Sequence, residues 1–186
     1  MPKRVDHEER RRALAAALVR HARRHGLHAT GFREVAAEAG VSVNLVQYYF
    51  PTKADLLVGG LARVRALITE RLAALPSEPG ARVRAILHEL LPADEAATDL
   101  YRIHAAYAAL AFTDDALADQ PHAAGPDQLH PELTRLLTDR AADPSRAAIS
   151  LLALGTGLSA YVTSGFLTLA DARRVLDDAL AAALSP

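Results

Sequence analysis

Three polar side chains, Asn44, Gln47 and Tyr48, fall within about 100° of arc if the segment around them is helical. The amides of asparagine and glutamine donate and accept together, which matches the N6/N7 edge of adenine, and a tyrosine hydroxyl can reach a phosphate oxygen. Val46 and Phe50 lie four residues apart and point the other way. The segment therefore predicts a short helix that packs by one face and contacts DNA with the other. The alternative is an ordinary polar face in an all-helical domain.

A helix-turn-helix is the arrangement that would position such a face. Phe32, Val35, Ala36 and Ala39 recur at helical spacing, so the preceding helix has one apolar side. Gly40 then ends this helix where a left-handed backbone is needed, a conformation that glycine adopts at little steric cost.

The second helix has its own start and stop signals. The hydroxyl of Ser42 can accept a hydrogen bond from a free backbone N–H and so cap the helix, and Pro51 ends it. Lys53 would then lie at the N-terminus of the next helix, where free N–H groups already favour an anion such as phosphate.

Composition predicts an all-α fold. Of 186 residues, 51% are hydrophobic and 40 are alanine, the strongest helix former, and no run of alternating β-branched residues is present. The chain has no cysteine, which excludes disulfides, thiol chemistry and cysteine-based metal sites. Without an apolar signal segment or an apolar run of about 18 residues, the protein is expected to be soluble and cytoplasmic.

The charge is unevenly distributed. Residues 1–60 carry 10 Lys+Arg against 6 Asp+Glu, whereas the remainder is acidic, with 11 against 16. A basic N-terminal region on an acidic body favours phosphate contact at one end. For any single one of these basic residues, a solvated arginine-rich helix remains a fair explanation.

The pattern predicts two domains, a DNA-binding domain at 1–52 and a helical domain at 53–186. The expected helices span residues 6–25, 32–39, 43–50, 53–75, 81–91, 94–112, 144–163 and 169–184. Residues 113–131 contain three prolines and a glycine, so they are expected to be irregular, either a loop or a lid over a pocket, with the loop favoured.

Residues 26–57 resemble the TetR family of transcriptional regulators. The segment reads GLHATGFREVAAEAGVSVNLVQYYFPTKADLL, and the family pattern is matched by Thr30, Ala36, Gly40, Val41, Ser42, Tyr49, Phe50, Lys53 and Leu57. ELLPADE at 89–95 and LLALGTGLSAYVTSGFLTLADARRVLDDAL at 151–180 look like the BetI-type branch of TetR C-terminal domains.

The resemblance implies which residues contact DNA. It assigns base-facing positions to Ser42, Val43, Asn44 and Gln47, a base or phosphate contact to Arg33, and backbone contacts to Tyr49 and Lys53. There are three departures from the family pattern: Gly31 replaces a common Thr or Ser, Asn44 a common Gly, and Gln47 a common Tyr. With Gly31 there, capping of the second helix is expected to fall to Thr30. The other two changes bear on the operator sequence rather than on DNA binding itself.

The resemblance also implies a homodimer that pairs through its last two helices and reads a palindromic operator. Small residues at Gly155, Gly157, Ser159 and Ala160 would permit close helix contact. Apolar area on these helices comes from Leu151, Leu154, Leu158, Tyr161, Val162, Leu169, Val175, Leu176, Ala179 and Leu180. Periodicity alone cannot distinguish this interface from the core of a single protomer.

A pocket for an unknown small-molecule effector is implied in the helical body. Its candidate residues are Tyr101, His104, Tyr107 and Phe112, although a buried Tyr or His is more often a satisfied core residue than a ligand contact. The expected function is a repressor released from its operator by the effector. The alternatives are a transcriptional activator and an effector-independent DNA-binding protein of the same fold.

No catalytic motif is apparent, and neither an enzyme nor a cofactor is expected. His21 and His25 lie four residues apart, and His28 follows, which invites a metal site. No acidic or cysteine ligand is adjacent, and cationic groups at a helix C-terminus are already favoured by the helix dipole. We therefore expect no metal, no membrane contact, and DNA as the main partner.

Overall fold

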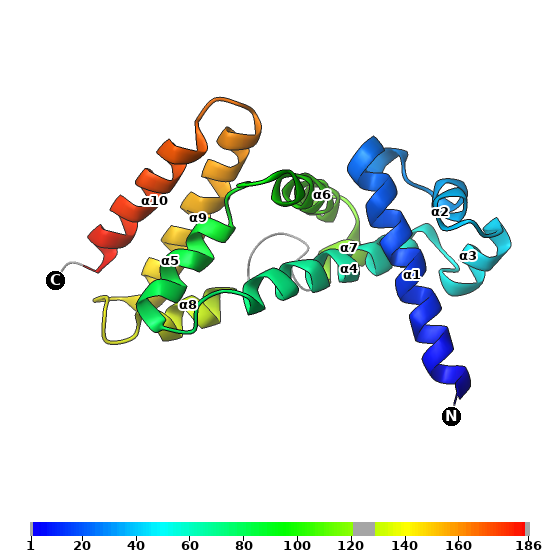
Figure 1. Cartoon of the computed structure of the whole chain (residues 1–186), viewed down its shortest axis with the longest axis horizontal. Coiled ribbons are helices and arrows are strands. Elements are labelled where there is room, and N and C mark those ends of the chain that lie inside the picture. Colours follow the sequence, from blue (N-terminus) through cyan, green and yellow to red (C-terminus); the bar gives the residue numbers. More distant parts are fainter. Residues whose placement is uncertain (1, 121–128, 185–186) are drawn as a thin grey trace. The chain divides into compact units, whose positions relative to one another are not determined.

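The computed structural model describes residues 2–120 and 129–184, with side chains from His7 onward. Within these ranges the chain is all-α and contains no strand, as predicted (Figure 1). The helices are α1 (Pro2–His25), η1 (a 3-10 turn, Leu27–Ala29), α2 (Phe32–Ala39), α3 (Val43–Tyr49), α4 (Lys53–Ala73), α5 (Pro79–Glu89), α6 (Glu95–Ala111), α7 (Asp115–Ala118), α8 (Leu129–Leu137), α9 (Pro144–Thr163) and α10 (Leu169–Ala183). None of these described helices is long and apolar enough to cross a bilayer.

The chain divides into two compact units. Unit 1 comprises Met1–Thr69 and Arg102–Ala124, and unit 2 comprises Glu70–Tyr101 and Gly125–Pro186. Helices α4 and α6 each contribute residues to both units. The domain boundary that the sequence predicts, after residue 52, stays a prediction.

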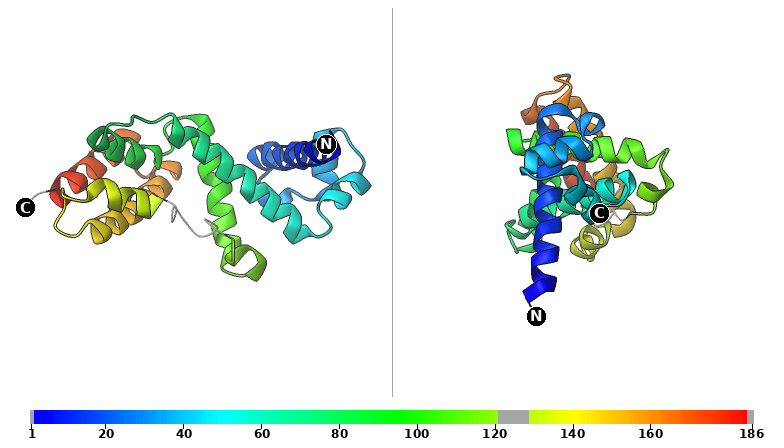
Figure 2. Two further views of the ribbon diagram at one scale, coloured as in Figure 1. Left: turned by 90° about the horizontal axis from the view of Figure 1, so that it is seen from below. Right: turned by 90° about the vertical axis from the view of Figure 1, so that its right-hand side faces the viewer.

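Unit 1 contains a three-helix head in which α1 packs on α2 and α2 on α3. Leu14, Leu18 and Ala22 lie on the buried side of α1. Residues 7–13 of the same helix are exposed, and its N-terminal turns extend past α2 and α3 (Figure 2). Most of the helix-forming energy of such a head comes from burying one apolar face rather than from propensity alone.

Two glycines of α4 permit close packing inside unit 1. A Cβ placed on Gly59 would lie 2.4 Å from the ring of Phe50, and one on Gly60 would lie 2.3 Å from the hydroxyl of Tyr107. Tyr107 belongs to the part of α6 that lies in unit 1, and its side chain is fully buried. Its hydroxyl has no hydrogen-bond partner among the described residues, and burial raises the pKa of this phenol well above its usual value.

Tyr107→Phe is expected to raise the free energy of unfolding by about 1 kcal/mol, because it removes a buried hydroxyl without a partner and keeps the ring. Gly60→Ala should instead destabilise by about 1–3 kcal/mol, since the new methyl group meets that hydroxyl. Urea denaturation followed by circular dichroism measures both. Because the two groups touch, the double variant should be more stable than the sum of the single changes predicts. Additive effects would contradict this packing.

Unit 2 is built mainly from α5, α8, α9 and α10, in which α9 contacts each of the other three. Gly155 of α9 lies against Leu90, whose Cδ1 atom would be 2.6 Å from an added Cβ. Ser159 is also buried, and its Oγ donates to the carbonyl oxygen of Leu90 at 2.7 Å. These two small residues therefore belong to the core of the protomer, not to an interface between protomers.

The prediction that residues 113–131 are wholly irregular is wrong at both ends. Helix α7 lies at Asp115–Ala118, and α8 begins at Leu129; residues 121–128 lie outside the described residues. Pro131 is one of the prolines that predict a break, but it lies in the first turn of α8, where a missing backbone N–H costs nothing. The buried side of α8 shows helical spacing, with Leu129, Leu133, Leu136 and Leu137.

Other helix ends agree closely with the predicted ranges. Helix α9 has the predicted bounds, because Asp143 caps its N-terminus by accepting from the backbone N–H of Arg146 at 3.0 Å, and Pro144 follows as its first residue. Helix α5 starts two residues earlier than predicted. There the carboxylate of Glu78 accepts from the N–H groups of Gly80 and Ala81, at 2.9 and 2.6 Å, so Pro79 opens the helix rather than preventing it.

Candidate nucleic-acid interface

Local sequence signals fix the position of α3 in the head. Gly40 adopts the left-handed conformation (φ 66°) that ends α2, and the N–H of Val41 donates to the carbonyl of Ala36 at 3.0 Å. The Oγ of Ser42 then accepts from the N–H of Leu45 at 3.3 Å, which caps α3 as predicted.

The two sides of α3 differ in the way that its periodicity predicts. Val46 and Phe50, the latter at its C-terminal cap, are completely buried. Among the predicted DNA contacts on the recognition segment, Ser42, Asn44, Gln47 and Tyr48 are exposed, whereas Val43 and Tyr49 are half-buried. Tyr48 is 69% exposed, a large fraction for an aromatic side chain in a folded head. The outward side of α3 thus offers two amides, a hydroxyl and a phenol to a partner.

His7 also lies on this surface, although no pattern in the sequence indicates it. Its ring centroid lies 4.5 Å from that of Tyr49 and 6.0 Å from that of Tyr48, and the two tyrosine rings are 5.2 Å apart. The neighbouring turn of α1 places the guanidinium of Arg11 5.1 Å from the ring centre of Phe50. The N-terminal part of α1 therefore packs on the end of α3, a contact that no local pattern could predict.

Lys53 is held at the N-terminus of α4 by an internal contact. Its ammonium donates to the backbone carbonyl of Thr30, and the same side chain lies near Glu34. Partial burial lowers the pKa of Lys53, and the charge of Glu34 opposes that shift. An ammonium group has three N–H donors, so a lysine in this position can bind Thr30 and still contact a phosphate.

The predicted capping of α2 by Thr30 is wrong. Thr30 is almost fully buried, and its hydroxyl donates to the carbonyl of Gly26 at 2.9 Å. The cap residue is Gly31, whose N–H donates to the carboxylate of Glu34 at 3.0 Å. A glycine without a capping side chain is thus compensated by an acidic residue three positions later, which is half of a capping box.

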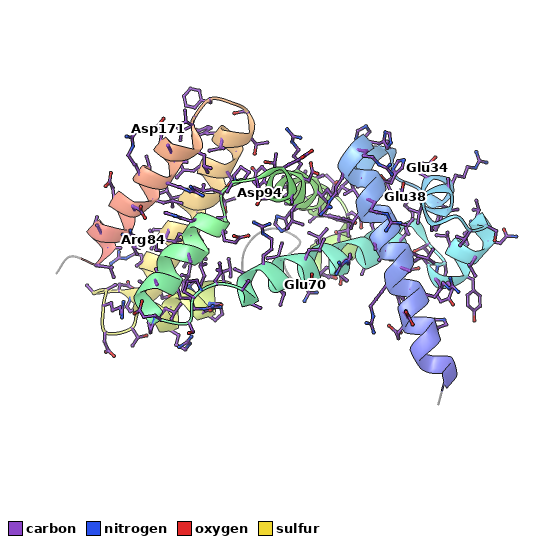
Figure 3. The ribbon with its side chains drawn as sticks, in the orientation of Figure 1. Glu34, Glu38, Glu70, Arg84, Asp94 and Asp171 are labelled. Carbon is purple, nitrogen blue, oxygen red and sulfur yellow. The ribbon has the colours of Figure 1, made fainter. Side chains whose placement is uncertain are left out.

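Arg33 is exposed on α2 and lines a hollow of about 570 Å³. The lining residues are His21, Arg24, His25, Arg33, Glu34, Ala37 and Glu38. Arg20 and Arg24 of α1 both bind the carboxylate of Glu38 on α2; Figure 3 marks Glu34 and Glu38 on that helix. The hydrogen bond from Arg20 and the charge of Arg24 lower the pKa of Glu38 despite some desolvation.

The four predicted effector-pocket residues lie in different environments. Tyr107 is buried against Gly60, and Phe112 is 82% exposed. His104 is half-buried in unit 1, and Tyr101, also half-buried, is assigned to unit 2. Of the four, Tyr107 alone combines full burial with a hydroxyl that lacks a partner among the described residues.

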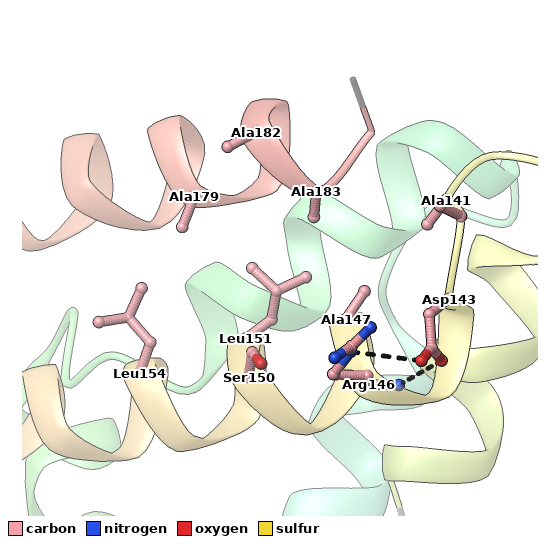
Figure 4. Close-up of a pocket in the computed structure, with 11 residues that line it drawn as sticks. Ala141, Asp143, Arg146, Ala147, Ser150, Leu151, Leu154, Ala179, Ala182 and Ala183 are labelled. Atoms are coloured by element: carbon pink, nitrogen blue, oxygen red, sulfur yellow. Dashed lines mark hydrogen bonds and ion pairs between the residues drawn. The ribbon is translucent and has the colours of Figure 1, made fainter. Parts of the chain in front are cut away.

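A second surface lies on α9 and α10, which run side by side in unit 2. Along α9 the exposed positions include Ile149, Ala153, Gly157, Ala160 and Tyr161. Between the two helices a groove of about 430 Å³ is lined on one side by Ala147, Leu151 and Leu154 and on the other by Ala179, Ala182 and Ala183 (Figure 4). Most of the lining is alanine and leucine, and Asp143, Arg146 and Ser150 line the groove at the N-terminal end of α9.

A head with a capped helix-turn-helix, followed by a helical body, defines the class of DNA-binding transcriptional regulators. Two family descriptions match the chain: bacterial regulatory proteins of the tetR family at residues 14–58, and the C-terminal region of BetI-type transcriptional repressors at residues 79–185. The chain belongs to the TetR family, with a BetI-type C-terminal region.

Individual relatives agree with this assignment. The HTH-type transcriptional regulator PksA of Bacillus subtilis is 30% identical over 125 residues, a match that covers 66% of this chain and 61% of PksA. A transcriptional regulator from Rhodococcus sp. RHA1 superposes with a TM-score of 0.84 at 28% identity, covering 94% of this chain and 95% of that one. The multidrug binding protein EbrR, solved with imidazole, gives a TM-score of 0.69 at 28% identity, covering 96% and 93%.

Proposed function

We propose that this regulator is a repressor that binds a palindromic operator as a homodimer in the cytoplasm and leaves it when a small molecule binds. Its role is regulatory rather than catalytic. The observation that carries the proposal is the outward side of α3, where Asn44, Gln47 and Tyr48 are exposed on a helix anchored by Val46 and Phe50. Such a helix can lie in the major groove and present its amides to base edges.

The remaining contacts divide by chemistry. Asn44 and Gln47 read bases, and Ser42 and Val43 lie at the start of α3, the end of a recognition helix that contacts base edges. A second group binds the phosphate backbone and fixes the register of the head on the duplex; it comprises Arg33, Tyr48, Tyr49 and Lys53. Arg33 has no salt bridge with a described residue, so its charge is available to DNA.

Asn44→Ala and Gln47→Ala should each weaken operator binding by about 1–3 kcal/mol and relax the preferred base at one position of each half-site. Lys53→Ala should weaken binding to every duplex and reduce the dependence of affinity on salt. The operator is first obtained by selecting bound sequences from random DNA. Fluorescence anisotropy over a salt series then measures each variant.

Because Lys53 also holds the carbonyl of Thr30, its variant needs a thermal-denaturation control to separate lost stability from lost phosphate contact. The matched control for the amides is Gln120→Ala, which removes an amide from the end of α7. Unchanged base preference in both α3 variants would refute the assignment of these amides to base contacts.

The partner proposed for the surface of α9 and α10 is a second copy of this chain. Exposed small and apolar residues run along α9 at intervals of three and four, from Ile149 to Tyr161. The groove beside them is lined largely by alanine and leucine, so side chains of a facing helix pair can enter it. A dimer of this kind presents two recognition helices, and a two-fold protein matches a palindromic site.

The proposal that a small molecule releases the protein from its operator is supported by related proteins that have been solved with small molecules. EbrR has been solved with imidazole and with malachite green, and a regulator from Saccharomonospora viridis with choline. In this chain His104 and Tyr107, both in unit 1, remain the proposed contacts; Tyr101 is assigned to unit 2, and Phe112 is too exposed to contribute strongly. The effector favours a state whose heads are spaced wrongly for the operator.

The proposed release has a direct test. A true effector should raise the thermal midpoint of the protein and release labelled operator at the same concentrations. An activator would keep its operator when the effector binds. An effector-independent DNA-binding protein would show neither response across a compound library.

A further inference from the structure

We propose that Arg11 of α1 is a positioning residue that sets the pose of α3, and so its selectivity among DNA sequences, rather than a contact to phosphate. This inference rests on the proposed function, in which the exposed side of α3 reads the operator. Basic residues beside a DNA-binding helix are ordinarily interpreted as phosphate contacts. The surroundings of Arg11 give its charge partners inside the protein instead.

One face of α1 continues outward past the core of the head. Leu14 and Leu18 are buried on that face, and Arg11 precedes Leu14 by three residues, which is a helical interval. His7 lies one turn further out, and its ring centroid is 4.5 Å from that of Tyr49 on α3. The N-terminal turns of α1 therefore lie against the end of α3, and Arg11 lies on α1 between that contact and the core.

The first partner of Arg11 is an aromatic ring. Its guanidinium lies over the ring of Phe50, 5.1 Å from the ring centre. A cation in this position is attracted by the negative face of the ring. Phe50 is completely buried, caps the C-terminus of α3, and lies so close to Gly59 of α4 that an added Cβ there would be 2.4 Å from the ring. The ring thus contacts both α1 and α4, and the end of α3 is placed by both contacts.

The second partner is the residue pair that begins α4. Asp55 accepts from the N–H and the hydroxyl of Thr52, at 3.0 and 2.7 Å, and the N–H of Asp55 donates back to that hydroxyl at 3.0 Å. These hydrogen bonds hold the pKa of Asp55 below its usual value, and the charge of Arg11 lowers it further despite some desolvation. Arg11 therefore acts on the residue that ends α3 and on the pair that begins α4.

A displacement of α3 affects base contacts more than phosphate contacts. The amides of Asn44 and Gln47 need a bidentate geometry on base edges, whereas the attraction between charges falls off gradually with distance. Helix α3 has 7 residues, so both amides lie within about two turns of the end that Phe50 caps. Removing Arg11 should therefore weaken binding to the operator more than binding to random DNA.

The test compares Arg11→Gln with Arg12→Gln, which removes the same charge from the next exposed position, about 100° away around α1. Fluorescence anisotropy over a salt series measures affinity for the selected operator and for a random duplex of the same length. Arg11→Gln should weaken operator binding about three- to tenfold and leave random-duplex binding unchanged. The salt dependence should also stay unchanged, whereas a lost phosphate contact reduces its slope by about 0.9. Arg12→Gln should keep the ratio of the two affinities.

Further variants separate position from stability. Arg11→Lys keeps a cation for the ring and should retain part of the selectivity, whereas Arg11→Met keeps the apolar stem alone and should lose as much as Arg11→Gln. In a Phe50→Leu background, which lacks the ring, Arg11→Gln should add little to the loss. Thermal denaturation followed by circular dichroism establishes that each variant is folded at the temperature of the binding measurement.

Three results would overturn this role of Arg11 and leave the proposed function standing, provided that the wild type prefers its operator. Equal losses on both duplexes with a reduced salt slope would make Arg11 a phosphate contact. Equal losses with an unchanged slope and a lower thermal midpoint would assign it to stability alone. Unchanged selectivity in Arg11→Gln would show that α3 is placed without it. If the wild type prefers no duplex sequence, both the proposed function and this role are wrong.

Discussion

Gly157→Glu is expected to give a folded protomer that no longer dimerises and that binds the selected operator about 100-fold more weakly. No described atom lies within 4 Å of a Cβ added at Gly157, so the protomer itself has room for the new side chain. A glutamate also favours helix more than glycine does, by about 0.5 kcal/mol. In the proposed dimer, however, the same position brings two carboxylates into a desolvated apolar contact.

The measurement is sedimentation velocity at micromolar protein, with thermal denaturation and operator binding on the same samples. Gly157→Ala is the uncharged control, which adds only a methyl group: it should keep the dimer and stabilise α9 by about 0.5–1 kcal/mol. Gly155→Ala is the internal contrast, because its methyl group meets Leu90 and should destabilise the protomer without addressing the interface. A dimeric Gly157→Glu with full operator affinity would exclude this face of α9 as the interface.

Phe50→Ala should lower the free energy of unfolding of the head by about 3–5 kcal/mol, the usual cost of deleting a buried aromatic ring. Phe50 is completely buried, lies against Gly59 of α4 and accepts the guanidinium of Arg11 on its face. It is also the cap residue that ends α3. Its loss therefore removes the packing of the recognition helix on α4, through Gly59, and on α1, through Arg11.

Tyr48→Ala is the matched aromatic control, two residues away and 69% exposed. Its effect on the free energy of unfolding should stay within about 0.5 kcal/mol, whereas its effect on DNA affinity should be measurable. Urea denaturation monitored by circular dichroism compares the two variants. Similar stability losses at both positions would mean that α3 does not pack by the side assigned to it.

The helices and the two sides of α3 could be predicted because they depend on neighbours within about one turn. Ser42, Gly40 and Asp143 act on backbone groups three or four residues away, so their types and spacing are sufficient evidence. The sequence analysis does not predict helix α8, and the reason is also local. A proline is tolerated in the first turn of a helix but breaks a later turn, so Pro131 by itself fits either a helix start or a break.

The contacts that complete the candidate site could not be predicted in this way. His7 meets Tyr49 across 42 positions of sequence, and Lys53 meets Thr30 across 23. Gly155 and Gly157 show a second reason why sequence patterns fail. Both are glycines two positions apart on one helix, but Gly155 packs against Leu90, whereas no described atom lies within 4 Å of a Cβ placed at Gly157. The exposed side of α9 carries apolar residues such as Ile149 and Tyr161 beside Ser150 and Thr156, so periodicity could not separate the two glycines.

Those two glycines also bear on how regulators that arise by gene duplication stop forming mixed dimers. Gly155 is constrained by Leu90 of its own protomer, whereas a Cβ at Gly157 would meet no atom of the described residues within 4 Å. If the proposed dimer interface is correct, substitutions at Gly157 and its exposed neighbours change which subunit the chain pairs with, while each subunit keeps its fold. A paralogue can therefore diverge into an independent homodimer through a few changes on one side of a single helix.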